Sequence, residues 1–256
     1  MGYIDLIILG VIQGLTEFLP VSSSGHLVFI QHFLKIESPG TSLEVILHLG
    51  TLCSIIFFYN KELSSLLSQI ISFEIEALKY IFYILFGIIP AAIAGVFFKD
   101  FFTSFFNNLY FTSYFLIFTG FILFCSKFME HKMNSLSLKN TFMVGLIQAF
   151  SIFPGISRSG MTISVAMFLG LEKKEAFKLS FFLAIPIIIG ATILEIPHLM
   201  SMDNSSIFPL IIGFFVSACS GYIALKSLYK IVIKNKFWIF SLYCFIIGII
   251  GVFYAR

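Results

Sequence analysis

The chain has 256 residues, of which 59% are hydrophobic and only 11% are charged. Soluble domains carry about 25% charged residues, so this composition excludes a soluble globular protein and predicts a polytopic membrane protein. The net charge of +3 is too small to imply nucleic-acid binding, and no basic cluster is interleaved with aromatic residues, so we expect no nucleic-acid partner.

The first apolar stretch, residues 2–34, is interrupted by the segment PVSSSG at residues 20–25. Neither arm is long enough to cross about 30 Å of hydrocarbon. Non-helical backbone at membrane depth is tolerated only when it is buried in protein or lines a wet cavity. We therefore predict a re-entrant helical hairpin here, followed by three spans near residues 43–59, 80–98 and 110–128.

The second half of the chain has the same order of segments. Residues 141–171 are interrupted by PGISRSG, which predicts a second re-entrant hairpin, and spans follow near residues 179–194, 207–228 and 237–254. A shift of 135 residues aligns the two hairpins with seven identities in sixteen positions. The fold class predicted is all-α, a single membrane domain (1–256) with repeat one at 1–128 and repeat two at 139–256.

The two halves are expected to have opposite orientations in the membrane. Each half has one hairpin and three spans, and an odd number of crossings produces an inverted repeat, as in many transporters. Twelve lysines fall on one predicted side, against Lys35, Lys99 and Arg256 on the other. This bias places the lysine-rich side in the cytoplasm, both termini outside, and the two hairpin tips together near the midplane.

The hairpin tips carry ionisable residues, which are costly at membrane depth and are therefore functional candidates. They are Glu17 and His26 in hairpin one and Arg158 in hairpin two. A guanidinium binds phosphate or carboxylate in bidentate fashion, and serine hydroxyls with free backbone N–H groups also favour an anion. The tips therefore predict a phosphate site that is reached from a lipid.

Several polar residues keep two interpretations. The acid of hairpin one and the arginine of hairpin two could form a purely structural ion pair. Gln13 and Gln148, which the repeat aligns, most simply hydrogen-bond the broken backbone of the hairpins. Glu44 fits a solvated charge at a helix N-terminus as well as a site residue, and His48 could face the site or a neighbouring helix.

The segments QGLTEFLPVSSSGHL and PGISRSGMTIS together resemble the signature of the undecaprenyl-diphosphate phosphatase family, of the bacitracin-resistance type. The resemblance covers essentially the whole chain. It implies hydrolysis of undecaprenyl diphosphate, a polyprenyl diphosphate lipid, to undecaprenyl phosphate and inorganic phosphate. It places the enzyme in the bacterial cytoplasmic (inner) membrane with its site facing the periplasm, where it recycles the carrier for cell-wall synthesis and confers bacitracin resistance. The oligomeric state stays open, a homo-oligomer included.

The resemblance also implies the roles of individual residues. It assigns catalysis to Glu17, Ser23, His26 and Arg158, with His26 as a proton shuttle and a divalent cation, Mg²⁺ or Ca²⁺, bound by Glu17. The nucleophile is either Ser23 or a water on the cation. One departure is that Gln13 stands where many members carry a first glutamate. The substrate-binding residues implied are Gln13, Ser22, Ser24, Gly25, Ser157, Ser159, Gly160 and Thr162.

Three other classes compete with a diphosphatase. A transporter or lipid flippase would use the same inverted repeat and anion site, but it needs no nucleophile or proton shuttle. A type 2 phosphatidic-acid phosphatase also has an SGH segment before a Ser-Arg segment, but it expects a later histidine and an aspartate, and residues 161–170 contain neither. A structural membrane scaffold explains the composition but not the polar tips.

Overall fold

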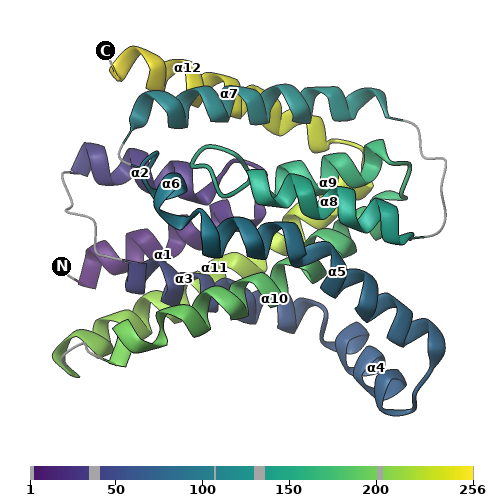
Figure 1. Cartoon of the computed structure of the whole chain (residues 1–256). Coiled ribbons are helices and arrows are strands. Elements are labelled where there is room, and N and C mark those ends of the chain that lie inside the picture. The colour runs from purple at the N-terminus through teal and green to yellow at the C-terminus, as the bar shows by residue number, and fades with distance from the viewer. Residues whose placement is uncertain (1–2, 35–40, 107, 130–135, 201–203, 256) are drawn as a thin grey trace.

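A computed structural model describes residues 3–34, 41–106, 108–129, 136–200 and 204–255, and within these residues the fold is helical throughout (Figure 1). Short 3₁₀ turns at Ser126–Phe128 and Phe237–Ile239 adjoin two of the helices. The helices are α1 (Tyr3–Phe18), α2 (Ser23–Leu34), α3 (Thr41–Phe58), α4 (Asn60–Ile71), α5 (Ile75–Phe97), α6 (Lys99–Thr103), α7 (Leu109–Cys125), α8 (Leu138–Phe150), α9 (Arg158–Phe168), α10 (Lys173–Met200), α11 (Asn204–Ile233) and α12 (Phe240–Tyr254).

Five of the described helices are long and apolar enough to cross a membrane. They are α5, α10 and α11, together with α7 and α12, each of which is extended by its adjoining 3₁₀ turn. The first predicted span, residues 43–59, corresponds to α3, which qualifies only jointly with α4, and these two helices are bent by 77° relative to each other. The chain is therefore a multi-pass membrane protein with five such helices, or six if the bent pair is one span.

The outer surface of the long helices is apolar. Phe97 at the end of α5 is 77% exposed and Phe253 in α12 is 70% exposed. A surface with so many large apolar side chains would associate in water but suits contact with lipid. This pattern agrees with the membrane class predicted from composition.

Two helices were not predicted from the sequence, α4 and the short α6. In α4, Leu63 and Leu66 pack against the main core, whereas Lys61 and Glu62 are exposed. The helix is amphipathic and only twelve residues long, so a search for long apolar runs passes over it. It leaves the bundle at an angle to α3, as Figure 1 shows.

Both interrupted stretches fold as two short helices joined by a turn, α1 with α2 and α8 with α9. Ser22 Oγ accepts a hydrogen bond from the backbone N–H of Gly25 at 3.2 Å, and Ser157 Oγ accepts one from Gly160 at 3.1 Å. Serine is a favoured residue at this position because its oxygen satisfies a free N–H of the first helical turn. The 135-residue shift relates these two bonds, so the similar sequences form the same local structure.

Each short-helix pair packs on a long helix from the other half of the chain. α1 lies against α11, and α8 lies against α5. A methyl group on Gly10 would lie 3.0 Å from the carbonyl oxygen of Gly213, and one on Gly145 would clash with the backbone of Gly87. Small residues at these crossings let the helix backbones approach closely, and the 135-residue shift also relates Gly10 to Gly145.

Candidate active site

The turns of the two hairpins contact each other. The backbone N–H of Gly155, a residue with φ of 95°, donates to Ser22 Oγ at 3.0 Å. A methyl group on Gly25 would lie 3.1 Å from Gly155, and one on Gly160 would lie 3.2 Å from Pro20 Cβ. The two predicted glycines therefore lie at the contact between the turns, where a side chain would separate the tips.

Glu17, at the end of α1, is the centre of the polar cluster at this contact, and it is only 8% exposed. Its Oε1 accepts from Arg158 Nη2 at 2.5 Å. Its Oε2 accepts from Ser23 Oγ at 2.7 Å and from Gln13 Nε2 at 3.0 Å, and His48 Nε2 lies 3.4 Å from the same oxygen. Residues from α1, α2, α3 and α9 thus meet at one buried carboxylate.

A cavity of about 400 Å³ opens beside this cluster. Its apolar walls include Ile152, Ile187 and Ile188, so it combines a polar end with an apolar lining. Such a cavity suits an amphiphilic ligand whose anionic group lies beside the guanidinium. Polar side chains that line it are Thr16, Glu17, Ser22, Ser23, Ser24, Glu44, His48, Lys99, Gln148, Ser151, Ser157, Arg158, Thr192 and Glu195.

Of the four residues assigned to catalysis, His26 lies away from this cavity. Its Nδ1 lies 2.8 Å from the carbonyl oxygen of Ser22, which only accepts, so Nδ1 donates. Its Nε2 is then left to accept from the Tyr243 hydroxyl at 2.7 Å. The ring holds the turn against α12 in this arrangement, and its role as a proton shuttle stays a prediction.

The hydroxyl groups of two residues predicted to bind substrate, Ser159 and Thr162, also lie outside the lining of the cavity. Ser159 is fully buried, with its Oγ 3.3 Å from Ser157 Oγ. Thr162 Oγ1 donates to the carbonyl oxygen of Arg158 at 2.7 Å and lies 2.6 Å from Ser180 Oγ. Neither lines the cavity, and their roles in substrate binding stay predictions.

The prediction that Gln13 and Gln148 hydrogen-bond the interrupted backbone of the hairpins was wrong. Gln13 donates to Glu17, and Gln148 lines the cavity with no hydrogen-bond partner at either amide atom among the described residues. Gln148 is 4% exposed, and an unsatisfied buried polar group costs about 1–3 kcal/mol. The sequence contains one sign of this difference. The 135-residue shift aligns Glu17 with Ile152, so the second hairpin has no carboxylate there for Gln148 to contact.

The side chains around Glu17 do not by themselves form a complete ligand set for a divalent cation. The carboxylate of Glu17 already contacts four nitrogen or hydroxyl groups, and the Arg158 guanidinium beside it repels a cation. No group of three His, Cys, Asp or Glu within the described ranges could hold a metal ion. Mg²⁺ is usually bound by one or two carboxylates together with substrate phosphates and water, so binding of a cation by Glu17 stays a prediction.

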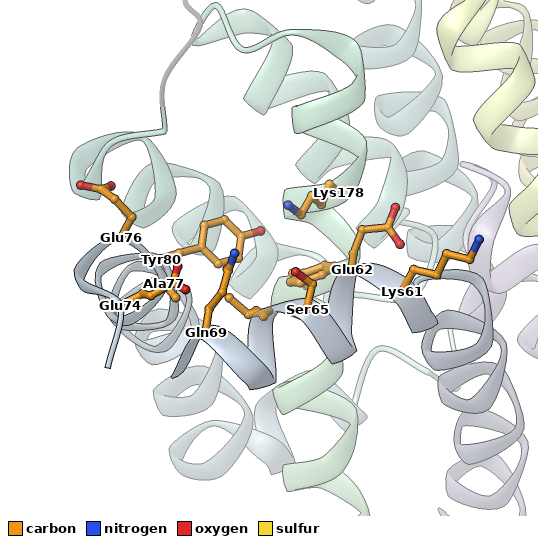
Figure 2. Close-up of a pocket in the computed structure, with 11 residues that line it drawn as sticks. Lys61, Glu62, Ser65, Gln69, Glu74, Glu76, Ala77, Tyr80 and Lys178 are labelled. Carbon is orange, nitrogen blue, oxygen red and sulfur yellow. The ribbon is translucent and has the colours of Figure 1, made fainter. Parts of the chain in front are cut away.

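A second cavity, of about 450 Å³, lies among α4, the start of α5 and α10 (Figure 2). The ammonium group of Lys178 lies 5.1 Å from the centre of the Tyr80 ring beside it. Acidic and basic side chains both line this second cavity. None of the residues predicted from the sequence for catalysis or substrate binding lies among the described residues of its lining. The cavity at the hairpin tips is therefore the candidate active site. The charged residues of the second cavity are Lys61, Glu62, Glu74, Glu76 and Lys178.

Comparison with known proteins agrees with this geometry. Residues 6–250 match the model of a family described as bacitracin resistance protein BacA. Among similar proteins named undecaprenyl-diphosphatase, that of Halothermothrix orenii is 37% identical over 100% of this chain and 99% of the relative. That of Thermosipho africanus is 41% identical over 96% of this chain and 98% of the relative. The chain therefore belongs to the BacA family of bacitracin resistance proteins.

Proposed function

We propose that this protein hydrolyses undecaprenyl diphosphate to undecaprenyl phosphate and inorganic phosphate, which recycles the lipid carrier for cell-wall synthesis and confers bacitracin resistance. The observation that carries the proposal is the buried contact of Glu17 with both Ser23 and Arg158 in a cavity with apolar walls. It unites a nucleophile, a base and a guanidinium that binds phosphate. The names of the similar proteins point to the same reaction.

In this proposal Ser23 is the nucleophile. As Ser23 Oγ bonds to the terminal phosphorus, its proton passes to Glu17 Oε2, 2.7 Å away. The bond between phosphorus and the bridging oxygen breaks, and Glu17 gives the proton to the departing lipid phosphate. A water then attacks the phosphoserine and loses a proton to Glu17, which passes it to Ser23 Oγ as inorganic phosphate leaves.

Charge stabilisation in this mechanism comes from two helix ends and one side chain. Ser23 and Arg158 are the first residues of α2 and α9, and the N-terminus of a helix favours anions. Arg158 lines the cavity, so we infer that its guanidinium binds a phosphate oxygen there. No step is assigned to a cation, and the need for Mg²⁺ or Ca²⁺ stays a prediction of the family resemblance.

We also propose that the fold is an inverted repeat of six spans and two re-entrant hairpins, with both termini outside and the cavity open to the periplasm or exterior. The lysine bias supports this orientation. The equivalent serine caps and the equivalent glycine crossings support the duplication. Two repeats that pack on each other's helices would bring the hairpin tips together at mid-depth.

The test is release of inorganic phosphate from undecaprenyl diphosphate by the detergent-purified chain, with and without EDTA. We expect Ser23→Ala and Arg158→Ala each to lower turnover by at least about 10²-fold, because each removes a group that acts on the reacting phosphate. Ser227→Ala is the matched control, since Ser227 is exposed on α11 and bonds only its own helix. Movement of labelled undecaprenyl phosphate across liposomes without phosphate release would instead favour a flippase.

A further inference from the structure

Glu17 and Arg158 form a contact through one guanidinium nitrogen and one carboxylate oxygen, although each side chain has two such atoms. Nη2 contacts Oε1, whereas Nη1 is buried with no partner among the described residues. Arginine and carboxylate pairs are frequently bidentate, with two parallel hydrogen bonds. The contacts on the other carboxylate oxygen therefore help to set the orientation of the Glu17 carboxylate.

Three groups contact that other oxygen, Oε2. Ser23 gives up its hydrogen bond during the proposed reaction, and Gln13 lies on the same helix one turn before Glu17. His48 is the contact from a separate helix, α3, with Nε2 at 3.4 Å. It therefore holds the carboxylate from outside the hairpins.

The ring of His48 is itself held in place. Its Nδ1 lies 2.7 Å from the carbonyl oxygen of Glu44, so Nδ1 carries a hydrogen. In the protonated ring Nε2 carries a second hydrogen and donates to Glu17 Oε2. α3 is fixed against α11, where Ser217 Oγ donates to the carbonyl oxygen of Leu47 at 2.8 Å. The imidazole side chain is nonetheless 31% exposed, because it also lines the cavity.

We propose that His48 is a positioning residue for the diphosphatase reaction. It holds Glu17 Oε2 next to Ser23 Oγ while Oε1 contacts Arg158, and it thereby fixes the carboxylate relative to both groups that act on the substrate phosphate. This inference rests on the proposed function and deepens it. A histidine that only joined α3 to the hairpin would affect stability, whereas a positioning residue also affects phosphate binding and turnover.

The experiment compares two substitutions at this position in the full-length, detergent-purified chain. His48→Leu keeps the volume and removes the nitrogen that contacts Glu17, whereas His48→Gln keeps an N–H group at the end of the side chain. Cys53→Ala is the control, since Cys53 lies on the same helix but is exposed. Turnover, KM for undecaprenyl diphosphate, inhibition by inorganic phosphate and the thermal midpoint are measured for each variant.

We expect His48→Leu to lower kcat/KM by about 10²-fold, with a lower kcat, a higher KM and weaker inhibition by phosphate. His48→Gln is expected to recover activity to within about tenfold of wild type, and Cys53→Ala to match wild type. The inference is overturned if folded His48→Leu keeps wild-type kinetics, or if His48→Gln is as impaired as His48→Leu.

A failure of the His48 proposal can be distinguished from a failure of the proposed diphosphatase function. A wild-type chain that releases no phosphate refutes the hydrolase proposal. Binding of inorganic phosphate to the purified protein then decides the inference. Weaker binding by His48→Leu than by wild type supports it, and equal binding overturns it.

Discussion

At the residue scale, the site depends on one carboxylate with different partners on its two oxygens. Arg158 contacts Glu17 Oε1, and Ser23, Gln13 and His48 contact Oε2. Because the guanidinium lies on one side and the serine on the other, the proposed transfer of the serine proton to Glu17 leaves the contact with Arg158 in place. A purely structural ion pair between the hairpins would not need the serine contact.

Gln148 gives a prediction at this scale. The residue lines the cavity, and its buried amide atoms have no hydrogen-bond partner among the described residues. We expect the amide to turn to a bound diphosphate, so Gln148→Leu should raise KM by about tenfold or more, as loss of a hydrogen bond to a charged ligand costs about 1.5–3 kcal/mol. The thermal midpoint should not fall, because a buried unsatisfied group is removed.

Ser164→Ala is the control for Gln148→Leu. Ser164 Oγ is also buried without a partner in the described structure, but the residue does not line the cavity. Its substitution should leave KM unchanged and the midpoint equal or higher. A fall in stability with no change in KM for Gln148→Leu would contradict a binding role.

At the element scale, close helix crossings decide where the hairpins lie. α8 crosses α5 with the backbones of Gly145 and Gly87 in direct proximity, and α1 crosses α11 at Gly10. The bond between Ser22 and Gly155 then joins the two turns. Any change that widens a crossing therefore moves one half of the site relative to the other.

The crossing of α8 with α5 is testable by substitution. Gly145→Val should destabilise the protein by at least about 1–3 kcal/mol, the usual cost of overpacking, and lower phosphate release as well, because α8 leads directly into the turn before Arg158. Gly190→Ala in α10 is the comparison, since a methyl group there meets no atom within 4 Å. Equal thermal midpoints for the two variants in detergent would refute this account of the crossing.

At the scale of the whole molecule, orientation decides which side of the membrane supplies the substrate. The proposed inverted repeat puts the turn between α4 and α5 in the cytoplasm and the end of α6 outside. Phe73 and Ser104 are exposed at these two places. In a background without native cysteines, Ser104→Cys should react with a membrane-impermeant maleimide in intact cells, and Phe73→Cys should react only after lysis. The reverse pattern would invert the proposed topology.

Much of this protein followed from the sequence alone. Composition predicted the membrane class, and breaks in two apolar stretches predicted both short-helix pairs, because proline, glycine and serine interrupt helices locally. Two segments around Glu17 and Arg158 predicted the family, which the match over residues 6–250 confirms. These are local properties of the chain, so they can be predicted without knowledge of contacts between residues far apart in sequence.

Tertiary structure decided which side chains meet. His48 rather than His26 lies beside Glu17, and Gln148 lines the cavity while its counterpart Gln13 bonds the acid. In helices that are apolar on nearly every side, periodicity does not identify the face that turns inward. That rotation depends on packing between helices far apart in sequence, so it is set only when the whole bundle assembles.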